Sequence, residues 1–260
     1  MSDNSFNFST ESPDNYEQKC LCVLVLDTSG SMNEIVDNTG ARSTGRTIQS
    51  DGQTYVLVEG GVSKLDLLNE GLSSFFEEII DDETTDQRLE LAIVTFNDTV
   101  TIVQEPALPS NVAIPPLEAQ GETALVEAVF NAIDLVSARK AWYKQTNQLY
   151  YRPWIILMTD GEPNRGRSVE ELVRRIKDDT ANKKYVFLPI GVDNANMSVL
   201  QQIQGTMNGK PVPAMKLGNT KFSSFFKWLS ASMGAVVNSD DNKNVNLPKA
   251  DNWMENFTIN

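Results

Sequence analysis

The chain has 260 residues, of which 40% are hydrophobic, and a formal net charge of −13 at pH 7. This excess of acid argues against nucleic-acid binding, because a phosphate backbone requires Lys and Arg on the protein surface, and it argues against an anionic membrane surface for the same reason. The sequence contains no histidine, which excludes Ser-His-Asp and Cys-His catalytic arrangements and histidine-ligated metal sites.

The pattern of apolar residues predicts strands that alternate with helices. Residues 20–26 form a continuous apolar strand, which is typical of a sheet covered on both faces. The predicted elements, in chain order, are a strand at 20–26, a helix at 64–80, a strand at 89–96, an antiparallel edge strand at 100–103, a helix at 123–140, a strand at 153–158, a helix at 168–179, a strand at 185–190, a short helix at 196–203, a strand at 214–217 and a helix at 222–236.

This alternation implies a mostly parallel sheet with right-handed crossovers in one α/β domain. We expect the domain to span residues 19–237, between a flexible polar leader at 1–18 and a polar C-terminal tail at 238–260. No apolar signal core precedes Cys20, and no apolar run approaches the roughly 20 residues that span a bilayer. The sequence therefore predicts a cytoplasmic protein. Cys20 and Cys22 share one face of their strand, which favours two buried thiols over a disulfide, with a redox or metal role as the alternative.

Polar side chains gather at three points where an apolar strand ends or a helix begins. Asp27-Thr28-Ser29-Gly30-Ser31 follows the strand at 20–26, Gly121-Glu122-Thr123 opens a helix, and Asp160-Gly161 follows the strand at 153–158. The carboxyl ends of strands in an open α/β sheet meet at the crevice that binds ligands. Hard oxygen donors suit Mg²⁺ or Mn²⁺ rather than zinc or copper. The candidate metal ligands are Asp27, Ser29, Ser31, Thr123 and Asp160.

Each of these residues also has an ordinary structural explanation. Ser29 and Ser31 could satisfy backbone groups in a turn, and Thr123 could be the N-cap of its helix. Asp160-Gly161 could be a plain turn. Their joint occurrence at three such junctions favours the metal site.

Taken together, the three segments resemble the von Willebrand factor A (vWA) family and its metal-ion-dependent adhesion site (MIDAS). The resemblance covers residues 19–236 and implies a three-layer Rossmann-like vWA fold, with a mostly parallel central sheet, one antiparallel edge strand and helices on both faces. It implies that Ser29 and Ser31 ligate the metal directly, that Thr123 joins in the ligand-competent state, and that Asp27 and Asp160 act directly or through water. Neutral hydroxyls leave the cation poorly neutralised, so an open position favours a carboxylate from a protein partner.

Finer motifs resemble the bacterial TerY-like subfamily: Leu26-Asp27-Thr28-Ser29-Gly30-Ser31-Met32, Leu68-Asn69-Glu70-Gly71-Leu72, Thr159-Asp160-Gly161-Glu162-Pro163 and residues 222–230. This resemblance implies a Ser/Thr protein kinase and a metal-dependent protein phosphatase as partners, in stress response, tellurite resistance or phage defence. The chain departs from the subfamily at residues 33–62, which are inserted after the first loop. Segments 45–49 and 54–58 predict a β-hairpin around an Asp51-Gly52 turn. The insertion is either a tolerated surface loop or a device that shapes partner specificity or shields the metal.

These observations predict a non-enzymatic, metal-dependent protein-interaction module. One alternative is a Mg²⁺-dependent phosphoryl-transfer enzyme built on a strand-end aspartate, but the second aspartate of such enzymes is replaced here by Ser29. Another alternative is a metal-free structural scaffold. The sequence has no Gly-x-Ser-x-Gly elbow and no Walker loop, which argues against serine hydrolase chemistry and ATP hydrolysis.

Overall fold

A six-stranded sheet forms the centre of the computed structural model, which describes residues 6, 8, 15–50, 53–161, 168–217, 221–239, 245, 247 and 248. The strand order is β12-β9-β8-β1-β6-β7, and every pairing is parallel except that of β6 with β7. The strands are β1 (Cys20–Asp27), β6 (Leu89–Phe96), β7 (Val100–Ala107), β8 (Trp154–Thr159), β9 (Val186–Val192) and β12 (Met215–Leu217).

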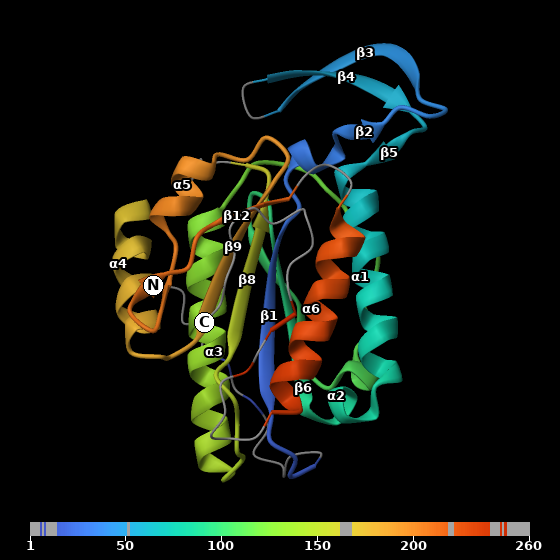
Figure 1. Ribbon diagram of the computed structural model, residues 1–260. Coiled ribbons are helices and arrows are strands. Elements are labelled where there is room, and N and C mark those ends of the chain that lie inside the picture. The colour runs from blue at the N-terminus through green and yellow to red at the C-terminus, as the bar shows by residue number, and fades with distance from the viewer. Residues whose placement is uncertain are drawn as a thin grey trace.

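Helices cover both faces of this sheet (Figure 1). Alternate residues of β1 point to opposite faces, so that Cys22 and Leu24 enter one hydrophobic core and Val23 and Val25 enter the other. The first core is closed by α1 (Lys64–Asp81) and α6 (Phe222–Val237), and the second by α3 (Leu125–Gln145), α4 (Val169–Ala181) and α5 (Met197–Gln202). The predicted three-layer α/β architecture with an antiparallel edge strand is confirmed. Cys20 and Cys22 are buried free thiols, as expected.

The inserted segment forms a hairpin that projects past the carboxyl ends of the central strands (Figure 1). Its strands β3 (Arg42–Ser50) and β4 (Gln53–Glu59) pair antiparallel, and β2 (Ile35–Asp37) pairs with β5 (Val62–Ser63) at its base. The predicted Asp51-Gly52 turn lies outside the described residues. Helix α1 begins directly after β5, where the Ser63 hydroxyl accepts from the Asp66 amide and the Asp66 carboxylate accepts from Ser63.

The structure corrects several predicted element bounds. Helix α3 begins at Leu125 with Ala124 at its N-cap position and no side-chain cap, so Thr123 is neither the first residue nor the cap of that helix. The edge strand β7 continues to Ala107 instead of ending at Val103. Several short elements were not predicted: the 3-10 helices η1 (Gly30–Asn33) and η2 (Pro109–Asn111), α2 (Glu83–Arg88), β2, β5, β10 (Thr206–Met207) and β11 (Lys210–Pro211).

Most of the predicted leader and tail lies outside the described residues. The parts that are described contact the domain: Phe6 packs against the second hydrophobic core, and Glu17 forms an ion pair of 2.7 Å with Arg88. The Trp228 indole donates to the Pro248 carbonyl over 3.0 Å. None of the helices in the described part of the chain has the length and apolarity needed to cross a lipid bilayer.

Candidate metal centre

Asp27 is the last residue of β1 and is fully buried. Its Oδ1 accepts from the Ser29 amide over 2.8 Å, and its Oδ2 accepts from the hydroxyl of Thr159, the last residue of β8. The Thr159 hydroxyl in turn accepts from the Gly161 amide over 3.1 Å. These contacts fix the carboxylate at the point where two neighbouring parallel strands end.

The two serines and Asp160 form a continuous chain of oxygen atoms. The hydroxyls of Ser29 and Ser31 lie 3.1 Å apart, and the Ser31 hydroxyl donates to Asp160 Oδ1 over 2.6 Å. Ser31 lies in η1, whereas Asp160 follows β8, so this last bond joins loops that are 129 residues apart in sequence. The β1 and β8 loops therefore share one cluster of oxygen atoms.

Thr123 reaches the same cluster from a third segment. Backbone hydrogen bonds attach that segment to the β1 loop: the Gln120 amide donates to Thr28 O, and the Gly30 amide donates to Gly121 O, both over 2.9 Å. A Cβ built on Gly161 would lie 3.0 Å from Thr123 Oγ1 and 3.6 Å from Asp27 Oδ2. The structure thus brings all five predicted ligands together, with four of them buried and Ser31 partly buried.

The electrostatics of the cluster favour a bound cation. Burial raises the pKa of Asp27 to about 7, and the negative charge of Asp160 adds to the effect, while hydrogen bonds from Ser29 and Thr159 oppose it. A shared proton or a bound cation would relieve the repulsion between these two carboxylates. The donors are two carboxylates and three hydroxyls, and the described residues hold no cluster of three or more His, Cys, Asp or Glu side chains that could hold a metal. This oxygen set fits a hard cation such as Mg²⁺ or Mn²⁺.

Lys64 is a member of the site that the sequence analysis missed. Its ammonium is 2% exposed and lies 2.8 Å from Asp160 Oδ2, 2.7 Å from Glu34 Oε2 and 3.5 Å from Asp193 Oδ2. Burial lowers the pKa of Lys64, but the contacts with Asp160 and Glu34 outweigh burial, so the pKa lies above its ordinary value. A signal was present in the sequence, because Lys64 opens α1, where the helix dipole disfavours a cation.

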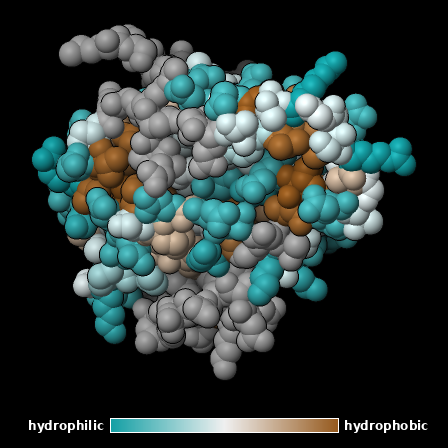
Figure 2. All heavy atoms as spheres, turned by 90° about the horizontal axis from the view of Figure 1, so that it is seen from above, coloured by the Kyte–Doolittle hydropathy of each residue, from teal (hydrophilic) through white to brown (hydrophobic). Residues whose placement is uncertain are grey.

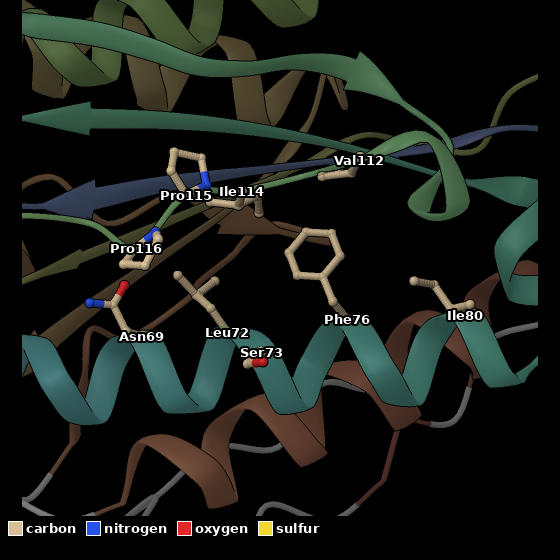
Figure 3. Close-up of a pocket in the computed structure, with 9 residues that line it drawn as sticks. All are labelled: Asn69, Leu72, Ser73, Phe76, Ile80, Val112, Ile114, Pro115 and Pro116. Carbon is tan, nitrogen blue, oxygen red and sulfur yellow. The ribbon is translucent and has the colours of Figure 1, made fainter.

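A separate groove of about 260 Å³ lies between α1 and the segment 112–116 (Figure 3). It is bounded by one face of the helix, including Leu72 and Phe76, and by the segment 112–116. The Asn69 side chain attaches that segment to α1, because its amide donates to Leu117 O over 3.1 Å and its carbonyl accepts from the Leu117 amide over 2.9 Å. None of the candidate metal ligands lines the groove, so it is a different feature from the oxygen cluster.

Comparison with known proteins identifies the fold family. The von Willebrand factor type A domain matches residues 22–225. No similar sequence was found among curated proteins. A von Willebrand factor type A structure from Catenulispora acidiphila is 16% identical with a TM-score of 0.54, over 84% of this chain and 43% of that chain.

Two further solved structures are more distant in shape. BatB from Bacteroides thetaiotaomicron is 16% identical with a TM-score of 0.47, over 84% of this chain and 98% of that chain. Proximal thread matrix protein 1 from the mussel byssus, in a form with a zinc-occupied MIDAS motif, is 18% identical with a TM-score of 0.48, over 86% of this chain and 46% of that chain.

The chain spans less than half the length of the first structures that it matches. The family match nevertheless covers most of the chain, from β1 to the first turn of α6, and it includes all five candidate ligands. The chain belongs to the von Willebrand factor A family.

Proposed function

We propose that the chain is a non-enzymatic interaction module that binds Mg²⁺ or Mn²⁺ and recruits a protein partner through the partner's Asp or Glu. The proposed metal ligands are Asp27, Ser29, Ser31, Thr123 and Asp160. The observation that carries the proposal is the oxygen chain from Ser29 through Ser31 to Asp160, next to the buried Asp27 carboxylate. Three of the five proposed ligands are neutral hydroxyls and Asp160 also pairs with Lys64, so a bound dication would keep positive charge that favours a further anionic ligand.

The inserted hairpin supports a protein partner in particular. Its side chains Ile48, Val56 and Leu57 are 46%, 57% and 36% exposed, and within the described residues β3 and β4 form a sheet of their own. An isolated two-stranded hairpin is only marginally stable in water, and exposed apolar side chains of this kind are typical of protein contacts. Figure 2 looks down on this end of the molecule and shows apolar patches among hydrophilic residues. We propose that the hairpin contacts the partner that donates the carboxylate.

The partner class follows from the finer motifs. The segments that resemble the TerY-like subfamily support assignment to it, and hence a Ser/Thr protein kinase and a metal-dependent phosphatase as partners in a bacterial stress-response or phage-defence system. The motif residues Glu162 and Pro163 lie outside the described residues, so this part of the proposal rests on the sequence. It is tested by measuring binding of each candidate partner to the chain in Mg²⁺ and in a chelator.

The metal site itself is tested by thermal unfolding of the full chain in Mg²⁺, in Mn²⁺ and in a chelator. A cation that binds only the folded chain raises its apparent stability. We expect this rise in the wild type and in Ser73→Ala, which changes an exposed serine on α1, but not in Ser31→Ala. An equal rise in all three proteins would place the cation elsewhere.

The absence of enzymatic activity is a proposal as well. The chain has no histidine to act as a general base, and the Lys64 ammonium is paired with carboxylates rather than free as an amine base. Hydrolysis of a generic phosphate ester in Mg²⁺ is the discriminating assay. Turnover that requires both the metal and Asp27 would favour the phosphoryl-transfer alternative.

A further inference from the structure

Lys64 is an unusual residue for a metal site, because it brings a positive charge to a carboxylate that the metal also needs. Asp160 uses its two oxygens differently: Oδ1 accepts from the Ser31 hydroxyl over 2.6 Å, whereas Oδ2 accepts from the Lys64 ammonium over 2.8 Å. Both Lys64 and the Asp160 side chain are almost fully buried, at 2% and 1% exposure. Water therefore screens this pair only weakly.

The position of Lys64 is fixed by the backbone and by two more carboxylates. The Lys64 amide donates to Glu34 O over 3.1 Å, and the ammonium lies 2.7 Å from the Glu34 carboxylate and 3.5 Å from that of Asp193. Glu34 follows η1 and precedes the hairpin base, and Asp193 follows β9. Carboxylates from three loops thus surround one ammonium. The ammonium occupies the position that another cation would take among these carboxylates.

We infer that Lys64 is a built-in counter-cation that weakens metal binding at the oxygen cluster, so that a partner's carboxylate is needed to complete the site. The inference rests on the proposed metal-dependent function. A cation held by Ser31 and Asp160 Oδ1 would share one carboxylate with the ammonium, and the two positive charges would repel each other in a buried environment. An anionic partner group lowers that repulsion, which couples metal binding to partner binding.

A purely structural role for Lys64 predicts the opposite effect of its removal. If the lysine only holds Asp160 in place, then neutralising it releases the carboxylate and weakens metal binding. If its charge opposes the metal, then neutralising it tightens metal binding, even though the metal-free protein loses stability because three carboxylates lose their contact with the ammonium. The direction of the change in metal affinity therefore separates the two roles.

The test is the dissociation constant of Mn²⁺ for the full chain, measured by the electron paramagnetic resonance signal of the free ion. Lys64→Gln removes the charge, Lys64→Arg keeps it, and Lys144→Gln removes an equal charge at the exposed C-terminal end of α3. We expect Lys64→Gln to bind Mn²⁺ at least about tenfold more tightly than the wild type. We expect Lys64→Arg and Lys144→Gln to stay within about threefold of the wild type.

The same measurements separate a failure of this inference from a failure of the proposed metal-binding function. Wild-type or weaker affinity in a folded Lys64→Gln protein, with folding checked by its melting transition in chelator, overturns this inference and leaves the metal site standing. Tight Mn²⁺ binding by Lys64→Gln, with no detectable binding by the other proteins, supports the inference most strongly. Binding by none of the proteins overturns the proposed metal site and this inference with it. If Lys64→Gln fails to fold, the double variant Glu34→Gln/Lys64→Gln replaces it, because it also removes one of the carboxylates that the lysine neutralises. Its Mn²⁺ affinity is then compared with that of Glu34→Gln.

Discussion

The Asp98 carboxylate occupies the space that a side chain at position 121 would need. A Cβ built on Gly121 would lie 2.0 Å from Asp98 Oδ2, and Gly121 has φ of +73°, in the left-handed region. Asp98 Oδ1 accepts from the Glu122 amide over 3.3 Å. The β6–β7 turn thereby holds the segment that presents Thr123, and only glycine at position 121 permits the contact.

Gly121→Ala should therefore disturb the metal site as well as the fold. Asp98 must swing away from the new methyl group and release the Glu122 amide, in addition to a left-handed strain of about 1–2 kcal/mol. Gly209→Ala is the matched control, because Gly209 has φ of +77° and nothing within 4 Å of its Cβ position. We expect both variants to lose stability in chelator and only Gly121→Ala to lose part of its stabilisation by Mn²⁺. Equal metal stabilisation in both variants would contradict a role for Asp98 in positioning Thr123.

Asp27→Asn should change stability in opposite directions with and without metal. At pH 8 the wild type holds two buried carboxylates near each other, because Asp27 is ionised above its pKa of about 7. The amide removes one of those charges, so we expect the metal-free variant to unfold at or above the wild-type temperature. We also expect the rise in melting temperature on adding Mg²⁺ to disappear. Asp81→Asn, at an exposed position at the end of α1, should leave both values unchanged.

The core strands and the clustering of the candidate ligands could be predicted because each leaves a local mark. The segments of β1, β6 and β8 are buried along their whole length, so they are rich in apolar residues, and β1 and β8 end at Asp27 and next to Asp160. Parallel strands then bring those ends together at one edge of the sheet. Thr123 was predicted from its position before an apolar helix, although its segment follows no strand of the sheet.

The parts that were missed either lack a clear apolar pattern or depend on contacts between distant residues. Helix α2 has the polar sequence Glu-Thr-Thr-Asp-Gln-Arg, and it begins where the Asp82 side chain accepts from the Thr85 amide. Helix α3 starts after Thr123 because the Ala124 amide donates to Asn97 O in the β6–β7 turn over 2.8 Å. Strand β7 includes Pro106, which an edge strand tolerates. A lysine at the start of α1 is unusual, but its carboxylate partners lie 30 and 96 residues away and no local pattern identifies them.

Asp179 should make the stability of the fold depend on pH in the acidic range. Burial raises the pKa of Asp179, but hydrogen bonds from Lys184 and Arg175, each 2.6 Å long, outweigh burial and hold the pKa below its usual value. A lowered pKa stabilises the folded chain above the unfolded value of about 4, and the stabilisation is lost as the pH falls through the folded value.

Asp179→Asn should accordingly lower the free energy of unfolding at pH 7 by about 1 kcal/mol. The effect is this small because both basic partners are partly exposed and screened by solvent. The difference in the free energy of unfolding between this variant and the wild type should shrink as the pH is lowered from 5 to 3. Urea unfolding across this range measures it, with Asp178→Asn, an exposed neighbour on α4, as the control. A difference that stays constant down to pH 3 would contradict the assignment.

Two glycines in helices should respond to alanine with opposite signs. A Cβ on Gly71 of α1 would lie 2.6 Å from Phe226 Cδ2, so Gly71 permits the close packing of α1 on α6. A Cβ on Gly234 of α6 would meet only Thr85 Oγ1, at 3.7 Å. We expect Gly71→Ala to destabilise the chain by about 1–3 kcal/mol through overpacking. We expect Gly234→Ala to stabilise it by roughly 0.5–1 kcal/mol through helix propensity. Denaturant unfolding of both variants measures the change in the free energy of unfolding. An increase in both variants would show that α6 can shift to make room for the new methyl group at position 71.

Removing one partner of a buried ion pair at the opposite end of the sheet should destabilise the fold. Arg139 donates to both oxygens of Glu90, over 2.8 and 2.7 Å, and the Tyr143 hydroxyl donates to Glu90 Oε2 over 2.6 Å. The Glu90 side chain is 4% exposed, and the Arg139 guanidinium lies 3.9 Å from the centre of the Trp142 ring. Each charge has therefore lost most of its water and depends on the other.

Glu90→Gln leaves the Arg139 charge without a partner and should destabilise the chain by about 3 kcal/mol or more. Arg139→Met leaves the Glu90 charge in the same position and should have a comparable effect. The double variant removes both charges, so we expect it to lose less stability than the sum of the two single variants. Urea unfolding at pH 7 of the four proteins in this cycle measures the coupling, with Glu77→Gln on the exposed face of α1 as the control. Additive losses would mean that water still solvates the pair.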